Sequence, residues 1–107
     1  MSAELDIQSS IQAFVTSEYA TAFWWGKNPM HDRGVAEASW LPDGFWYINR
    51  VLVRPPELRG KGIGGQLLER LKQELKEKAK ATLIVVDPGG YDMNVKKQQD
   101  FYRKHGF

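Results

Sequence analysis

The spacing of apolar residues is clearest in the second half of the chain. One stripe recurs every four residues and consists of Ile63, Leu67, Leu71 and Leu75. This period predicts an amphipathic helix of about four turns, with Leu68 widening its apolar face. Glu74 and Lys78 stand four residues apart on the same helix, so we expect them to form a surface ion pair.

Two apolar segments flank this helix and predict strands. FWYINRVLVRPP, at 45–56, is rich in aromatic and β-branched residues. Pro55 and Pro56 end it, because proline cannot donate to a ladder. TLIVVD, at 82–87, predicts a short buried strand that is too apolar for the edge of a sheet.

The last segment of the chain, NVKKQQDFYRKHGF at 94–107, predicts a second helix. Asp92 or Asn94 is the expected cap at its start, and Gly106 is the expected end. The order of the second half is thus strand, glycine-rich loop, helix, strand, helix. A right-handed crossover through the first helix would make the two strands parallel.

The first half of the chain predicts short antiparallel strands. TAFWWG at 21–26 and GVAEASW at 34–40 are strand-like, and Pro42-Asp43-Gly44 has the chemistry of a turn. Residues 5–15 fit a period of two and a helical period equally well, so strand and helix both remain open there.

Length and composition limit the possible functions. A chain of 107 residues is one small domain with a modest core, and we assign 1–107 to a single α+β domain. It contains no cysteine, which excludes disulfides, thiolate metal sites and a cysteine nucleophile. The sequence shows no signal peptide and no apolar run of roughly 18 residues, so we expect a soluble cytoplasmic protein that does not bind a membrane.

The net charge of +2 is unevenly distributed. Residues 1–53 carry −3, residues 54–80 carry +4 and the remainder carries +1. The positive charge gathers around the glycine-rich loop, and part of it is explained by a solvated helix face. Arg54, Arg59 and Lys61 flank backbone that is suited to a phosphate group. A nucleic-acid partner is disfavoured, because the charge surrounds one loop and forms no stripe.

The loop satisfies two nucleotide-binding patterns. Gly60, Gly62 and Gly65 fit the dinucleotide pattern G-x-G-x-x-G. Against this pattern, residues 54–59 separate the first glycine from the preceding strand, whereas a dinucleotide loop turns directly off its strand. Too little chain follows residue 87 to complete a doubly wound sheet.

The second pattern is the coenzyme A pattern (Arg or Gln)-x-x-Gly-x-Gly, formed by Arg59, Gly62 and Gly64. VLVRPPELRGKGIGGQLLERL at 51–71 and FYRKHGF at 101–107 together resemble the GNAT-type N-acetyltransferases. The resemblance spans Trp46 to Phe107 and implies a GNAT-like fold. Such a fold has a mostly antiparallel central sheet, a parallel splayed strand pair around the coenzyme A site, and flanking helices.

The resemblance also implies an activity and its residues. A GNAT protein transfers an acetyl group from acetyl-CoA to an amine acceptor, by direct attack and without a metal. Backbone groups of Val51, Leu52 and Val53 would bind the pantetheine arm, and Tyr102 would protonate the departing thiolate. The residues implied to hold the pyrophosphate are Arg59, Gly60, Lys61, Gly62, Ile63, Gly64 and Gly65.

Several departures from the family pattern keep other functions open. One extra residue precedes the loop, Val95 stands where relatives often have asparagine, and no glutamate stands on the strand at 45–53. The alternatives are a catalytically silent CoA-binding protein and a protein-interaction module. The family usually continues for two further strands beyond Gly106-Phe107.

Aromatic residues and histidines complete the candidates. Trp24, Trp25, Trp40 and Trp46 could line an acceptor pocket, but they are better explained as the core of a small sheet. We expect His31 and His105 at the surface.

Without the two further strands that the family usually has after Gly106-Phe107, one edge of the strand at 82–87 would be exposed. An exposed apolar edge favours pairing with another chain. We favour a homodimer as its cover, with residues 5–15 lying there as a strand as the alternative.

Overall fold

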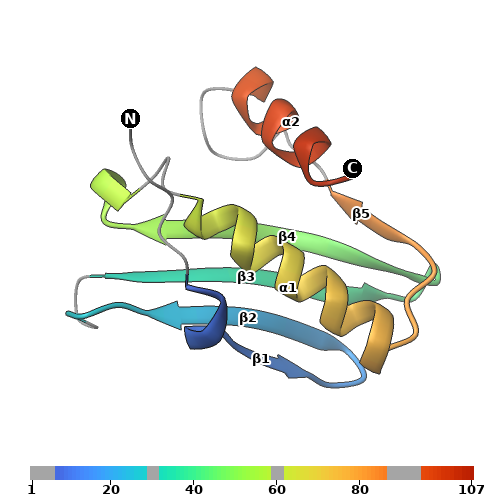
Figure 1. Cartoon of the computed structure of the whole chain (residues 1–107). Helices are drawn as coiled ribbons and strands as arrows, with labels where there is room; N and C mark the ends of the chain where they lie inside the picture. Colours follow the sequence, from blue (N-terminus) through green and yellow to red (C-terminus); the bar gives the residue numbers. More distant parts are fainter. Residues whose placement is uncertain (1–6, 29–31, 59–61, 87–94) are drawn as a thin grey trace.

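The computed structural model of the protein describes residues 7–28, 32–58, 62–86 and 95–107 (Figure 1). The side chains of Val95, Lys97 and Gln98 are not described. The described elements are, in chain order, β1 (Gln12–Val15), β2 (Tyr19–Trp25), β3 (Arg33–Leu41), β4 (Phe45–Arg54), α1 (Ile63–Lys78), β5 (Ile84–Val86) and α2 (Val95–Lys104), with short 3-10 helices at Gln8–Ser10 and Pro56–Leu58.

The sheet has the order β1-β2-β3-β4-β5. The first four strands form the expected antiparallel meander, and β4 and β5 are parallel. The turn between β3 and β4 has the predicted chemistry, because Gly44 has φ +98° and its amide donates to the carbonyl of Leu41. The α+β class and the mixed, mostly antiparallel sheet are therefore confirmed.

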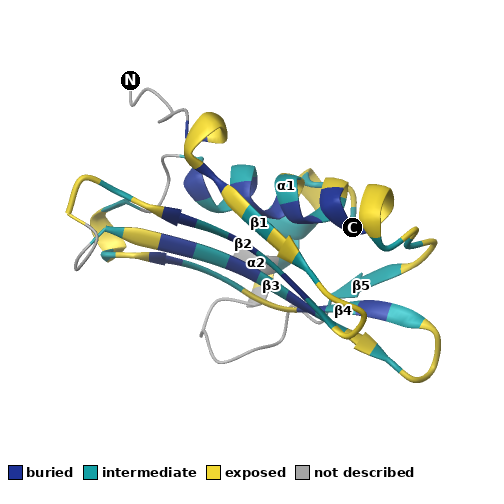
Figure 2. Ribbon diagram, turned by 90° about the horizontal axis from the view of Figure 1, so that it is seen from below, coloured by how far each residue is buried: buried dark blue, intermediate teal, exposed yellow. Residues whose placement is uncertain are grey.

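Helix α1 lies across one face of this sheet, as Figures 1 and 2 show. Its predicted apolar stripe is the centre of the core, with 1% or less of each residue exposed: Ile63, Leu67, Leu68, Leu71 and Leu75. The sheet meets the helix with small residues that are fully buried: Ala20, Ala22, Ala36 and Ala38. At Gly34 a Cβ would stand 2.7 Å from Cδ1 of Leu67, so the glycine permits this close approach.

One predicted surface contact on α1 proves to be more buried than expected. The pair of Glu74 and Lys78 is present, with 2.8 Å between Oε2 and Nζ, but Glu74 is only 5% exposed. Arg70 donates to its other carboxylate oxygen at 2.9 Å. Two basic side chains thus compensate a carboxylate that α1 buries against the sheet.

The predicted burial of the segment 82–87 in the middle of the sheet is wrong. β5 covers only Ile84–Val86 and stands at the edge of the described sheet, with all three residues half-buried. Its apolar side chains have a different explanation, because Ile84 and Val86 pack against the core and Phe107 packs beside them. The apolar composition of this segment indicated that one face of β5 is covered. It gave no information on whether β5 has a neighbouring strand on both sides.

The amino-terminal segment resolves into a strand at its end. β1 pairs with β2 in the register Gln12 to Phe23 through Val15 to Ala20. It occupies the sheet edge opposite β5, so the expectation that residues 5–15 cover the edge of β5 is wrong. β1 takes that place because a tight turn returns the chain, with the amide of Thr16 donating to the carbonyl of Tyr19 at 2.7 Å.

The tryptophans divide between core and surface. Trp24 and Trp46 are 7% and 3% exposed, whereas Trp25 and Trp40 are 51% and 41% exposed. The core interpretation therefore holds for two of the four. Among the described residues, no helix is long and apolar enough to cross a membrane.

Candidate active site

β4 and β5 separate beside the start of α1. β5 pairs with β4 only from Trp46 to Ile48, whereas β4 continues to Arg54 and stays paired with β3. In Figure 1 the two strands diverge along their length. No strand of the described chain lies on the β5 side of residues 49–54, which we call the unpaired segment of β4. Backbone groups on that side of β4 have no strand partner.

A bulge in β4 coincides with the point of separation. Glu37 of β3 stands opposite Arg50, but the next residue, Ala38, stands opposite Ile48. Asn49 is therefore an extra residue without a partner in the register. A bulge bends its strand and increases the local twist. Since Ile48 is also the last residue paired with β5, this bend accounts for the divergence of the two strands.

The first turn of α1 points its amides toward the same region. Gly62 precedes the helix in the left-handed conformation, with φ +81°, which favours glycine. The amide of Gln66 makes the first helical bond to the carbonyl of Gly62. The amides of Ile63 to Gly65 have no acceptor within the helix, and they carry the positive end of its dipole. This turn is a suitable partner for a phosphate group.

Contacts of Gly64 place this turn beside the unpaired segment. A Cβ at Gly64 would lie 3.4 Å from Cγ1 of Val51, 3.6 Å from Cγ2 of Val53 and 3.8 Å from Cζ of Phe101. Strand β4, helix α1 and helix α2 thus meet at one glycine. The side chain of Leu52 points to the opposite face of the sheet, because side chains alternate along a strand.

Tyr102 lies on α2, half-buried among other aromatic rings. Phe101 and Phe107 meet its ring edge-on, with centroids 5.2 and 5.9 Å away. Burial raises the pKa of the Tyr102 phenol, and the nearby phenol of Tyr47 on β4 raises the pKa further. A phenol in this environment stays protonated at neutral pH and can donate its proton.

The chain matches the family model for the acetyltransferase (GNAT) domain over residues 20–107. It belongs to the GNAT acetyltransferase family. The match extends from β2 to α2 and includes the strand separation, the glycine-rich loop and Tyr102. Comparison with curated proteins and with solved structures gave no match.

The structure brings together most of the residues that the GNAT resemblance singled out. Val51 to Val53 lie on the unpaired segment of β4, and Gly62 to Gly65 form the first turn of α1. Tyr102 is on the adjacent helix, next to Phe101. Arg59, Gly60 and Lys61 lie outside the described residues, as do His31 and the two expected caps of α2, Asp92 and Asn94.

His105 was expected at the surface, but its side chain is only 16% exposed. Its Nδ1 lies 3.1 Å from a carboxylate oxygen of Glu69 on α1, and its ring centroid is 4.9 Å from that of Phe101. A Cβ at Gly65 would stand 2.7 Å from two atoms of the imidazole ring. His105 therefore fills the space that Gly65 leaves open and fixes α2 against α1. In the sequence, Gly65 could have indicated a close approach by another side chain, but the sequence did not show that the imidazole ring of His105 makes it.

A second polar group that the sequence did not indicate stands beside the bulge. Glu37 on β3 accepts hydrogen bonds from the phenol of Tyr19 and from Nε of Arg50. Burial pushes the pKa of Glu37 upward, but these two donors outweigh burial and hold the pKa below its usual value. Glu37 points away from α1, because its neighbours Ala36 and Ala38 face the helix. The described residues hold no cluster of three potential metal-binding side chains.

Proposed function

We propose that the protein binds acetyl-CoA along the unpaired segment of β4 and transfers the acetyl group to an amine. The observation that carries the proposal is that β4 loses its partner β5 after Ile48, beside the first turn of α1. A pantetheine arm carries two amides and can pair with the backbone of Val51 to Val53 as another strand would.

The first turn of α1 is the proposed site of the pyrophosphate. The amides of Ile63, Gly64 and Gly65 are free within the helix, and the absence of a side chain at Gly64 leaves room near Val51. Arg59, Gly60 and Lys61 precede this turn in the sequence and complete the proposed loop. The dipole of α1 and the basic charge of the loop would both favour a diphosphate.

Tyr102 is the proposed general acid. The amine nitrogen attacks the thioester carbonyl carbon, the bond from carbon to sulfur breaks, and the phenol of Tyr102 gives its proton to the leaving thiolate. The phenol is protonated at neutral pH, as the role requires, although burial raises its pKa and so makes it a weaker acid than a free phenol. The excess proton on the acetylated nitrogen leaves to water and solvent then reprotonates Tyr102, so the reaction is balanced without a metal or a covalent intermediate.

Water is the proposed acceptor of the amine proton because β4 contains no carboxylate. Glu37 lies on β3 opposite Arg50 of β4, so it is a carboxylate on a strand paired with β4. It already accepts hydrogen bonds from Tyr19 and Arg50, and its lowered pKa makes it a weak base.

Release of free CoA thiol from acetyl-CoA tests the function directly. The chain contains no cysteine, so the protein itself contributes no thiol to a chromogenic assay, and each acceptor is also measured without acetyl-CoA to subtract its own thiols. We expect release above the hydrolytic background for at least one member of a panel of amines, peptides and lysate fractions. Thermal unfolding provides the binding measurement, with a stabilisation of about 2.7 kcal/mol when acetyl-CoA is present at a hundredfold excess over Kd.

NADH is the control ligand for the same measurement. A shift with NADH and none with acetyl-CoA would restore the dinucleotide interpretation of the loop. The absence of a carboxylate from β4 favours a second candidate, a catalytically silent CoA-binding protein. A clear thermal shift with acetyl-CoA but no thiol release with any acceptor would identify that function.

A further inference from the structure

The bulge in β4 points two consecutive side chains to the same face of the sheet. Nδ2 of Asn49 donates to Oγ of Ser39 at 2.7 Å, and Nε of Arg50 donates to the carboxylate of Glu37. Both partners lie on β3 and face away from α1, because Ala38 between them is buried toward the helix. Side chains normally alternate along a strand, so the bulge is what allows Asn49 and Arg50 to stand next to each other on one face.

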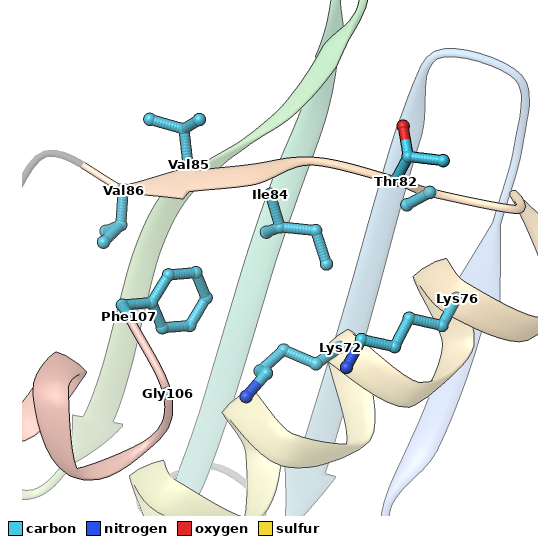
Figure 3. A pocket seen from close by; sticks show the side chains of 9 residues that line it. Lys72, Lys76, Thr82, Ile84, Val85, Val86, Gly106 and Phe107 are labelled. Atoms are coloured by element: carbon cyan, nitrogen blue, oxygen red, sulfur yellow. The ribbon is translucent and has the colours of Figure 1, made fainter.

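The face of the sheet away from α1 carries these two side chains, and we call it the open face. Helix α1 covers the other face (Figure 2), and Phe107 lies on the same side of β5 as α1 (Figure 3). On the open face, Phe14 and Trp25 are 57% and 51% exposed. We therefore expect an amine to approach the cofactor from the open face, where it meets Asn49 and Arg50.

The reacting end of the cofactor would lie beside the bulge, a step that rests on the proposed function. The pyrophosphate is assigned to the first turn of α1, which follows the end of β4 at Arg54, and the pantetheine arm to Val51 to Val53. The arm would therefore run back along β4, from Arg54 toward Asn49. Since β4 loses its partner β5 after Ile48, the thioester would lie where Asn49 and Arg50 project.

Arg50 has donors left for a ligand. A guanidinium carries five N–H groups, and the contact with Glu37 uses the one on Nε. The terminal nitrogens make no hydrogen bond or ion pair with a described residue. The side chain of Arg50 is 59% exposed, whereas that of Glu37 is 16% exposed and also accepts from the phenol of Tyr19. Glu37 thus anchors Arg50 and leaves free its two terminal nitrogens, which can bind a carboxylate with two parallel hydrogen bonds.

The charges of the described strands distinguish between two kinds of amine. Glu37 is the only carboxylate in the five strands, and it is already paired with Arg50. A di- or polyamine would therefore find no free carboxylate on these strands for its second ammonium group. An amine with a negatively charged group is the better match for this surface.

We propose that the acceptor is a small amine that also carries a carboxylate. The terminal nitrogens of Arg50 bind the carboxylate, and Oδ1 of Asn49 accepts a hydrogen bond from the attacking amine. The bonds made and broken are those of the acetyl transfer described under the proposed function.

Short straight-chain amino acids of increasing length, each compared with its own primary amide, test the proposal. With acetyl-CoA and the thiol assay, we expect kcat/KM for at least one acid to exceed that of its amide roughly ten- to hundredfold, the range of a hydrogen-bonded charge pair. A carboxylate raises the pKa of the amine in the same molecule, so the acid presents less free amine and its advantage cannot arise from protonation. Equal values for all acids and amides, or no release with any acid, would overturn the proposal.

The same measurements separate this proposal from the proposed function. A thermal shift with acetyl-CoA, together with thiol release only for amines that lack a carboxylate, would keep the acetyltransferase and reject this class of acceptor. Absence of both the shift and the release with every amine would reject the proposed function, and this proposal with it.

Variants of two arginines locate the site. Arg50→Gln should lower kcat/KM for the acid roughly ten- to hundredfold and leave the value for the amide unchanged. Arg50→Lys keeps the charge without the planar fork and should restore only part of the preference. Arg33→Gln is the matched control, because Arg33 is an exposed arginine on the open face at the start of β3, next to Gly34, which faces α1. Equal losses in Arg33→Gln and Arg50→Gln would show a general effect of charge and would reject the site.

Glu37 is a positioning residue in this proposal, since it acts through Arg50. Glu37→Gln should raise KM for the acid several-fold and leave kcat for the acid and kcat/KM for the amide unchanged, because the orientation of Arg50 is what the variant loses. A purely structural role would instead lower the turnover of acid and amide alike, and that result would overturn the role of Glu37.

Discussion

Replacing Gly65 by alanine sets a gain in helix propensity against a steric conflict with His105. Glycine inside a helix is less favourable than alanine by about 1 kcal/mol, so the substitution alone would stabilise α1 by that amount. In the folded protein the new Cβ would stand 2.7 Å from Cε1 and Nε2 of His105. This distance is far below a normal contact, and Glu69 and Phe101 hold the imidazole in position.

The expected size of the effect follows from these two opposing terms. Insertion of a methyl group into a filled site destabilises by about 1–3 kcal/mol. After the gain in propensity, Gly65→Ala should lower the free energy of unfolding by about 0–2 kcal/mol. In a His105→Ala background the conflict is absent, so the same substitution should instead stabilise by about 1 kcal/mol.

Urea unfolding of the four proteins in this double-mutant cycle measures the coupling. We expect an interaction energy of about 1–3 kcal/mol between Gly65→Ala and His105→Ala. The double variant should be more stable than the sum of the two single effects predicts, because His105→Ala removes the steric conflict. The same stabilisation by Gly65→Ala in both backgrounds would show that the imidazole does not fill the space over Gly65. The account of how α2 is held against α1 would then be wrong.

Three further outcomes are expected. Tyr102→Phe should lower the rate of thiol release by roughly 10²- to 10⁴-fold and leave the thermal shift with acetyl-CoA intact, since a general acid acts on turnover and not on binding; equal rates would assign Tyr102 to packing alone. Glu74→Gln should destabilise the protein by about 1 kcal/mol at pH 7. The partners Lys78 and Arg70 hold the pKa of folded Glu74 below its unfolded value, so this difference should be complete above about pH 4.5 and vanish as the pH falls through the folded pKa, in urea titrations from pH 7 to pH 2. Gly62→Val should abolish the thermal shift with acetyl-CoA, because a β-branched residue does not adopt φ +81° readily; an unchanged shift would remove the first turn of α1 from the proposed site.

Local periodicity was sufficient for the elements that carry their own pattern. The stripe from Ile63 to Leu75 predicted α1, and the β-branched segment up to Pro55 predicted β4. The chemistry of Gly44 predicted the turn between β3 and β4. In each case, interactions between residues close in the sequence determine the local structure.

Neighbour relations in the sheet could not be predicted in this way. Strand β5 has the composition of a central strand, yet it stands at the edge of the described sheet, and its apolar side chains are explained by the packing of Ile84 and Val86 against the core. The bulge at Asn49 depends on the register between two strands. The position of His105 depends on how α2 packs against α1. These features follow from contacts across the fold, which a single sequence does not display.

The short ladder between β4 and β5 has a consequence for the motions of the protein. The parallel register joins the strands over three residue pairs, from Trp46 with Ile84 to Ile48 with Val86, whereas β3 and β4 stay paired from Arg33 to Leu41. Segments that few backbone hydrogen bonds join to the sheet open at a lower free energy than the rest of a domain and exchange their amide hydrogens first. β5 and α2 should therefore open together, while α1 and β2 to β4 remain protected. A ligand that bridges β4, α1 and α2 would slow exchange most in the part of the molecule that exchanges fastest without it.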